Sequence, residues 1–320
     1  MALNGFQEPD KPRWGRWLVI VLAIAAAVVG VILVRRPAPT PAPAAIRTPP
    51  PVAASATATS GVAASGTAAE APASSSNVAA VVDLLAEGGA LEKKEALAEA
   101  RDKYLEALKL SAGDPLRSEI EERLGRVGIA LVSTPHAMPE KVDHTVQKGD
   151  SPVKLAQKYG TTPELILKQN RIQNPSLLKI GDRLRILNGK FSVTVSKSRN
   201  DLVVKLNDRF FKRYRTGTGK YGKTPVGAFM VSERIPHPVW WRPDGKAVPY
   251  GDKENILGTH WLTLRAAGTT EDIRGYGIHG TWETNSIGKS ESAGCVRMLN
   301  EQVEELYTIL PVGTPVAIED

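Results

Sequence analysis

The chain has 320 residues, more than one compact domain usually needs, and its hydrophobic fraction of 42% is ordinary. Its formal net charge of +7 fits a polyanionic environment such as a wall polymer or a lipid surface. Lysine and arginine are dispersed and form no basic block interleaved with aromatic residues, so nucleic-acid binding is not expected. The single cysteine excludes an intramolecular disulfide and is therefore kept for chemistry or packing.

An uncharged apolar run occupies residues 17–34. As a helix it would be about 27 Å long, close to the hydrocarbon core of about 30 Å in a bilayer. Arg35 and Arg36 directly after the run make a poor cleavage context for a signal peptidase. The run therefore favours an uncleaved signal anchor over a cleaved signal peptide. Residues 1–36 are expected to form a tail and a transmembrane helix, whose orientation the flanking charges do not settle because both sides are basic.

Residues 37–76 are almost wholly Pro, Ala, Thr, Ser and Gly, a composition that predicts a disordered tether. Residues 77–132 carry a helical apolar pattern that breaks at 112–115, which predicts two or three short helices. This region could dock a partner, although a structural spacer is the favoured interpretation. Residues 133–141 are expected to be a second linker.

Residues 142–188 have the pattern of a small βααβ unit. The first strand ends at a Gly-Asp turn, and a helix is expected at 153–159. A second helix should start with Thr162 as N-cap and Pro163 in the first turn. The segment 178–186 is expected to turn into the closing strand. The whole pattern resembles a LysM module.

The LysM resemblance implies binding of glycans that contain N-acetylglucosamine. The contacts would come from the turn after the first strand and from the loop before the closing strand, at Gly149, Asp150, Ser151 and Asn174. The same residue types are also needed to form those turns, so both interpretations remain open.

The lone cysteine, Cys295, follows Gly294, and His279 upstream is also followed by a glycine, Gly280. A thiol near pKa 8.5 is mostly protonated at neutral pH, and an imidazole within reach can remove that proton. A small neighbour lets a substrate carbonyl approach and leaves backbone N–H groups for an oxyanion. The alternative is a buried cysteine that serves only packing.

The sequence around Cys295 and His279 favours the catalytic interpretation of the cysteine over the packing one. The segments 276–281, 286–288 and 292–300 closely resemble the signature of the YkuD-type L,D-transpeptidases. Segments 223–229, 240–246, 255–259 and 312–318 resemble further parts of that family. The resemblance covers about residues 190–320, and the predicted catalytic domain is 189–320. Ala293 stands where the family often has His.

The resemblance implies a mainly-β catalytic domain, a β-sandwich. The residue pattern agrees, since short alternating segments predict strands and an amphipathic pattern predicts one helix at 300–310. The expected strands are 191–195, 202–206, 210–215, 228–231, 261–264 and 276–279.

The expected chemistry uses Cys295 as nucleophile and His279 as general base. The Gly280 carbonyl would orient His279, and backbone N–H groups at Gly294 and Cys295 would hold the oxyanion. Candidate substrate contacts are Arg297, Ser292, Tyr276, Trp241 and Asn255. For Arg297, lining the site and holding the loop through backbone carbonyls are equally open. The histidines lack clustered ligand spacing, so neither a metal nor a cofactor is expected.

By resemblance, the partners are peptidoglycan stem peptides and glycan strands. The donor would be a tetrapeptide stem cut at the bond between a diamino acid and terminal D-Ala, and the product a 3→3 cross-link. A carboxypeptidase, a cross-link hydrolase or a protein-to-wall ligase would use the same acyl-enzyme. A non-catalytic wall-binding protein is a further alternative. The substrate implied by the resemblance lies outside the cytoplasmic membrane. This predicts a single-pass protein of the bacterial inner membrane, in which residues 1–36 form a cytoplasmic tail and signal anchor and the catalytic domain is exported.

Overall fold

The computed structural model describes residues 75–111 and 115–320 of the chain. The expected transmembrane run at 17–34 lies outside these residues, as does nearly all of the expected linker 37–76. Among the helices within the described ranges, none is both long enough and apolar enough to cross a membrane.

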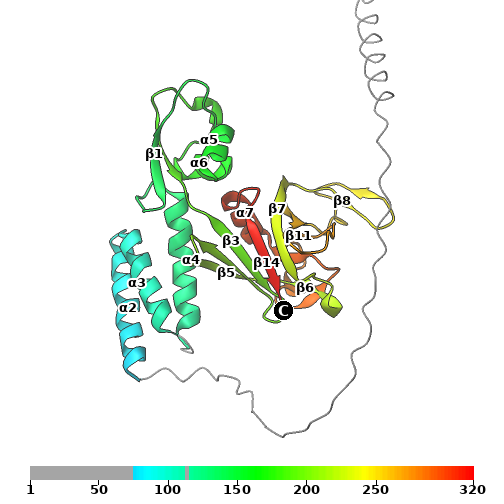
Figure 1. Ribbon diagram of the computed structural model, residues 1–320, viewed down its shortest axis with the longest axis horizontal. Coiled ribbons are helices and arrows are strands. Elements are labelled where there is room, and N and C mark those ends of the chain that lie inside the picture. The colour runs from blue at the N-terminus through cyan, green and yellow to red at the C-terminus, as the bar shows by residue number, and fades with distance from the viewer. Residues whose placement is uncertain (1–74, 112–114) are drawn as a thin grey trace, which may run out of the picture. The chain divides into compact units, whose positions relative to one another are not determined.

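Three helices precede the LysM-like unit (Figure 1): α2 (Ser75–Lys93), α3 (Leu97–Leu110) and α4 (Arg117–Ser133). They pack in chain order, α2 against α3 and α3 against α4. The α2–α3 contact is close because Tyr104 is fully buried over Gly88. A Cβ atom at Gly88 would lie 2.3 Å from the tyrosine ring. The prediction of two or three helices in this region is confirmed, and its described residues form three.

The helical region does not stand apart from the rest of the chain. Helix α4 packs against strand β5 (Arg209–Arg215), where Gly128 faces the ring of Phe211. Next to this contact, the Arg213 Nε donates a 2.6 Å hydrogen bond to Glu121 of α4. Leu124 of the same helix belongs to the core of the large sheet. The spacer expected from sequence is therefore packed onto the sheet.

The LysM-like unit has the expected βααβ order and a core of its own. The elements are β1 (Lys141–Thr145), α5 (Pro152–Tyr159), α6 (Pro163–Gln169), η1 (Pro175–Leu177) and β2 (Arg183–Leu187). Strand β1 pairs antiparallel with β2. Thr162 caps α6, because its hydroxyl accepts a 3.0 Å bond from the Leu165 N–H, and Pro163 opens the helix. Both predictions are confirmed.

The segment 178–186 turns into the closing strand, as expected. Residues 178–182 form a turn in which Gly181 has φ +95, and strand β2 begins at Arg183. Positive φ is natural for glycine, so this residue suits the turn.

The C-terminal part is mainly β. Its strands are β3 (Phe191–Ser196), β4 (Asp201–Leu206), β5, β6 (Thr218–Gly219), β7 (Gly227–Pro236), β8 (Trp240–Trp241), β9 (Ala247–Val248), β10 (His260–Ala266), β11 (Gly277–Thr281), β12 (Ser290–Ser292), β13 (Val296–Leu299) and β14 (Pro315–Glu319). Two short 3₁₀ turns, η2 (Lys220–Gly222) and η3 (Thr284–Ser286), and one helix, α7 (Asn300–Ile309), complete it. All six predicted strands and the predicted helix are present within a few residues.

Hydrogen bonds join eight of these strands in one mixed sheet with the order β13-β11-β10-β7-β14-β3-β4-β5. The expected sandwich would have two separately bonded sheets, whereas here the larger sheet is continuous and the other pairs, β12-β6 and β8-β9, are two-stranded. The mainly-β class is as expected. The parallel pair β11–β13 lies at one edge of the large sheet.

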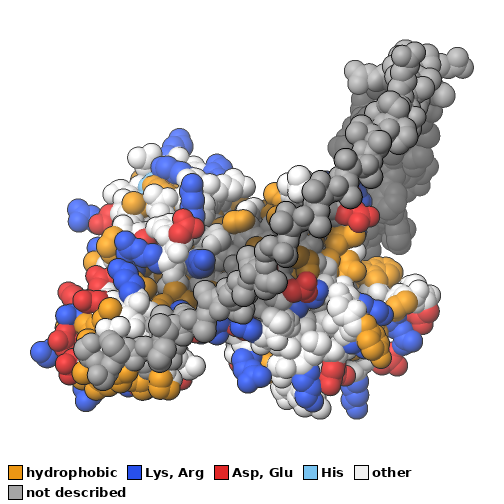
Figure 2. All heavy atoms as spheres, turned by 60° about the horizontal axis from the view of Figure 1, so that its bottom comes forward, with side chains coloured by type: hydrophobic (Ala, Val, Ile, Leu, Met, Phe, Trp, Pro, Cys, Tyr) orange, Lys and Arg blue, Asp and Glu red, His pale blue; other side chains and the backbone are white. Residues whose placement is uncertain are grey.

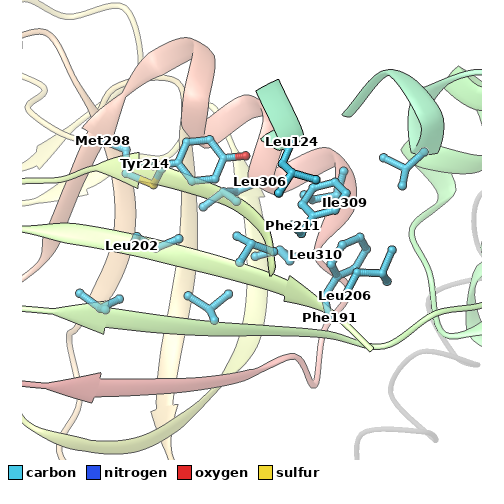
Figure 3. Close-up of a cluster of buried hydrophobic side chains, with 14 of the residues drawn as sticks. Leu124, Phe191, Leu202, Leu206, Phe211, Tyr214, Met298, Leu306, Ile309 and Leu310 are labelled. Atoms are coloured by element: carbon cyan, nitrogen blue, oxygen red, sulfur yellow. The ribbon is translucent and has the colours of Figure 1, made fainter. Parts of the chain in front are cut away.

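The core lies between this sheet and two helices (Figure 3). Leu306 and Ile309 of α7 meet Phe211 and Tyr214 of β5, and Leu124 enters from α4. The Tyr214 hydroxyl reaches the Glu305 carboxylate at 2.5 Å, which gives this buried polar group a partner. Burial of these apolar side chains is the main force that holds the sheet and the helices together.

The LysM-like unit contacts the catalytic part through α6. Leu165 is fully buried in the core of the larger unit. Glu164 pairs with Arg234 of β7 at 2.9 Å, and the Thr162 hydroxyl donates to the carbonyl of Thr308 on α7. On the face shown in Figure 2, lysine and arginine side chains are scattered among acidic and neutral ones, in agreement with the dispersed charge of the sequence.

Candidate active site

Cys295 and His279 come together because β11 and β13 are parallel neighbours. In their register, His279 lies opposite Arg297, and Cys295 immediately precedes β13. On the other side of β11, Trp261 of β10 lies opposite His279. The lone thiol and the histidine are thus placed at the same edge of the sheet by backbone pairing.

Both side chains open into a pocket of about 670 Å³. Its lining comprises Glu233, Ile235, His237, Pro238, Val239, Trp240, Trp241, Ile256, Leu257, Trp261, Thr263, Gly275, His279, Ser292, Ala293, Cys295 and Arg297. A mostly apolar cavity with a few convergent polar groups is the usual form of a substrate site. This pocket is therefore the candidate active site.

The Cys295 thiol donates a 3.7 Å hydrogen bond to the Gly275 carbonyl. Burial raises the pKa of this thiol above its ordinary value of 9.0, while the Gly277 backbone and Arg297 act in the opposite direction. The thiol is thus protonated in the free protein at neutral pH. No thiol–imidazole hydrogen bond joins Cys295 to His279 among the described residues, although such contacts often tighten only when substrate binds.

The His279 ring is held on two sides. Its Nδ1 donates to the Gly280 carbonyl at 2.6 Å, the contact expected from sequence. A carbonyl can only accept, so Nδ1 carries the proton and Nε2 is the basic atom. The ring also stacks on Trp261, with centroids 5.4 Å apart and planes inclined by 18°. Burial lowers the pKa of His279 to about 4, with a further lowering by Arg297, while the backbone groups of Gly280 and Leu257 act in the opposite direction.

The turn before the thiol depends on a glycine. Gly294 has φ +141, and a Cβ there would lie 2.7 Å from the ring of Tyr276. The Ser292 hydroxyl donates to the Cys295 carbonyl at 2.6 Å and accepts from the Gly294 N–H at 3.1 Å. Since the Gly294 N–H is already bonded to Ser292, the Cys295 N–H is the remaining candidate of the two expected oxyanion donors.

Arg297 lies in the pocket, which is one of the two roles left open by the sequence, and its contacts with a neighbouring backbone come from its main chain rather than from its guanidinium. Its side chain lines the pocket and pairs with Glu283 at 2.8 Å. Its backbone N–H and carbonyl pair with Gly217 at 2.8 and 2.9 Å. The residue therefore holds the β13 edge while its positive charge faces the thiol and the imidazole.

Of the other residues predicted to contact substrate, some line the pocket and others lie outside its lining. Trp241 lines the pocket and is 70% exposed. Tyr276 packs against the Gly294 turn. Asn255 is buried outside the lining, where its amide donates to the carbonyls of Pro238 and Val248 at 2.9 and 3.0 Å. The structure thus gives Asn255 the task of fixing the loop that carries Trp241, through bonds that a sequence does not reveal.

Sequence reasoning missed several lining residues, among them Trp261, Thr263 and Glu233. They belong to β7 and β10, and each strand presents alternate residues to the pocket. Alternation was the only signal that could have selected them. In residues 75–111 and 115–320, no cluster of three or more His, Cys, Asp or Glu side chains could hold a metal ion.

The predicted glycan residues of the LysM-like unit all occupy turns. Gly149 has φ +90, and Asp150 accepts 2.8 Å bonds from the backbone N–H of Gln147 and from the His144 ring. Ser151 caps α5, and Asn174 caps η1. Exposed apolar side chains stand near these turns: Val153, Leu177 and Ile180.

Comparisons with known proteins agree with this architecture. Residues 190–318 match the L,D-transpeptidase catalytic domain of the YkuD family, and residues 144–187 match the LysM domain. YqjB of Bacillus subtilis is 40% identical over 129 residues, which are 40% of this chain and 70% of YqjB. YkuD of Bacillus licheniformis is 31% identical over 182 residues, which are 55% of this chain and 97% of YkuD. Both names mark candidate L,D-transpeptidases.

The chain therefore belongs to the YkuD-type L,D-transpeptidase family, and a LysM domain precedes its catalytic domain. Among solved structures, an L,D-transpeptidase from Mycobacterium smegmatis aligns with 44% of this chain and 65% of its own, at 16% identity and a TM-score of 0.34. The chain thus spans slightly less than two thirds of that structure.

Proposed function

We propose that the protein is a peptidoglycan L,D-transpeptidase with Cys295 as nucleophile and His279 as general base. The observation that carries the proposal is the placement of the only thiol and a backbone-fixed, neutral histidine in one pocket. The thiol must first turn from the Gly275 carbonyl toward Nε2 of His279.

In the first half-reaction, the sulfur bonds to the carbonyl carbon between a diamino residue and terminal D-alanine. His279 takes the thiol proton and gives it to the leaving nitrogen as the C–N bond breaks. The Cys295 N–H stabilises the oxyanion. D-Alanine leaves, and a thioester remains. An acceptor amine then attacks the thioester and gives a proton to His279, which passes it to the sulfur as the C–S bond breaks. This restores the thiol and yields the 3→3 cross-link.

The remaining parts of the chain bring this site to its substrate. The LysM domain binds glycan strands through the turns at Gly149–Ser151 and Asn174. The apolar run at 17–34 anchors the chain in the inner membrane, and the linker 37–76 gives it reach. The length and composition of these two segments support the proposal. Carbonate extraction of membranes tests the anchor, and release of the protein would contradict it.

The decisive experiment is intact-mass analysis of the protein incubated with a tetrapeptide muropeptide. We expect a covalent adduct that is absent in Cys295→Ala, together with cross-linked dimers. An adduct with only trimmed stems would indicate a carboxypeptidase. Neither adduct nor turnover, with glycan binding intact, would indicate a non-catalytic wall-binding protein. In His279→Ala, unchanged rates in a folded variant would contradict the assignment of the base.

A further inference from the structure

The active-site pocket contains a carboxylate that the proposed reaction does not use. Glu233 of β7 is the only acidic residue among the lining residues, all of which the structure describes. Most of the other lining side chains are apolar or aromatic. The one lining guanidinium, that of Arg297, already pairs with Glu283. A negative charge in the substrate pocket of an acyl-transferase selects substrates, because it favours those with a cation at the matching place.

Backbone pairing fixes where Glu233 lies relative to the thiol. Thr263 of β10 lies opposite both Glu233 of β7 and Gly277 of β11. Residues opposite each other share a face, so Gly277, Thr263 and Glu233 form one row across three strands. The Cys295 thiol stands at the Gly277 end of this row, where the Gly277 backbone acts on its pKa. Because neighbouring strands are about 4.8 Å apart, Glu233 lies about 10 Å from that end.

Two consecutive hydrogen bonds along the same face hold the Glu233 carboxylate in place. The Trp261 Nε1–H donates to the Thr263 hydroxyl at 2.9 Å, and this hydroxyl donates to Oε2 of Glu233 at 3.1 Å. A carboxylate has about four acceptor sites, so one bond leaves capacity for a ligand. The indole of Trp261 covers Gly277, where a Cβ would lie 2.5 Å from the ring. The absence of a side chain at Gly277 therefore keeps the floor flat between the thiol and the carboxylate.

The spacing matches one part of the donor stem. The carbonyl under attack lies about 3 Å from sulfur. From this carbonyl carbon to the side-chain nitrogen of a diamino residue there are six bonds, about 7 Å when extended. Their sum of about 10 Å equals the main-chain separation along the row, so the nitrogen ends within reach of the Glu233 side chain. The attacking amine of an acceptor must instead approach the thioester itself, so it is too near the thiol to meet Glu233.

We propose that Glu233 is a specificity-determining residue for the donor stem, whose carboxylate binds the side-chain ammonium of the diamino residue attacked by Cys295. The inference rests on the proposed function and deepens it, since it names the feature by which the pocket recognises the third residue of the stem. The ion pair holds the extended side chain along the row and so aligns the carbonyl with the thiol.

Two synthetic tetrapeptide donors test this directly. One carries lysine and the other norleucine at the third position, so that they differ by the ammonium alone. The rate of thioester formation on Cys295, measured by intact mass and by D-alanine release, gives kcat/KM for each. We expect the unmodified protein to prefer the lysine donor about tenfold, as for a charge-assisted contact in a partly open site. In Glu233→Gln this preference should vanish through slower reaction of the lysine donor, with the norleucine donor unchanged.

Glu271→Gln is the matched control, because Glu271 is exposed and does not line the pocket. It should keep the tenfold preference. Glu233→Lys should invert the preference in favour of norleucine. An equal donor ratio in the unmodified protein and in Glu233→Gln would overturn the inference while leaving the transpeptidase in place. Failure of both donors to acylate the unmodified protein would instead overturn the proposed function, and the inference with it.

Discussion

Acid should destabilise the catalytic domain through His279. An unfolded histidine has the ordinary pKa of 6.5, whereas burial lowers the native pKa of His279 to about 4. Between these values the unfolded chain binds a proton that the native protein does not bind, so unfolding becomes easier as the pH falls. The stabilisation is complete above pH 6.5 and is lost as the pH falls toward 4. The full loss is about 3 kcal/mol, and about 2 kcal/mol of it is gone at pH 5.

Urea unfolding followed by tryptophan fluorescence measures this effect. Four of the six tryptophans lie in the catalytic domain: Trp240, Trp241, Trp261 and Trp282. None lies in the LysM domain or in the helical region, so the fluorescence reports the unfolding of the catalytic domain. The free energy of unfolding is compared at pH 7.5 and pH 5 in the unmodified protein and in His279→Gln. Glutamine cannot titrate, and its amide can still donate to the Gly280 carbonyl.

The variant should therefore lose about 2 kcal/mol less than the unmodified protein over this pH interval. The other titrating groups are present in both proteins and cancel in the difference. An equal pH dependence in the two proteins would refute the reasoning. It would mean that the imidazole already has an ordinary pKa in the native protein.

Three further results are expected. Alkylation of Cys295 by iodoacetamide should accelerate with a midpoint above pH 9 and show no step near pH 6.5; such a step would indicate a thiolate–imidazolium pair. Gly294→Ala should lower kcat/KM about a hundredfold, since its Cβ meets a tyrosine ring, whereas Gly245→Ala, open to solvent at a similarly positive φ, should keep activity. In thermal unfolding, Gly88→Ala should lower the free energy of unfolding by about 2 kcal/mol, because its Cβ overpacks against Tyr104. Gly89→Ala, whose Cβ lies closest to a flexible arginine, should leave the stability unchanged or raise it. Equal changes in the two variants would contradict the packing of Tyr104 over Gly88.

Local signals in the sequence predicted the elements well. The cap at Thr162 and the proline after it were read correctly, because a helix start depends on a few adjacent residues. The Gly294-Cys295 turn could be recognised for a similar reason, since the backbone conformation there admits little else than glycine. The turn and closing strand at 178–186 were also expected, since Gly181 marks the turn before the strand.

Contacts between distant segments were not predictable in this way. The packing of α4 onto β5 joins Glu121 to Arg213, which are 92 positions apart. Asn255 illustrates the same limit inside the site. As part of a family motif it looked like a substrate contact, and only the positions of two carbonyls show that it fixes a loop.

The row of Gly277, Thr263 and Glu233 shows what kind of information the structure adds. Each residue alone is unremarkable in sequence, and the three belong to strands β7, β10 and β11, of which only β10 and β11 are consecutive in the chain. Their relation exists only through strand register, since a slip of one residue would turn Glu233 away from the pocket. The proposed nucleophile can be found from a motif because its chemistry depends on its immediate neighbours. The selection of a substrate depends on spacing across the sheet, and it follows from topology that the specificity of this pocket is set by β7 and β10 as much as by the strands that carry the catalytic pair.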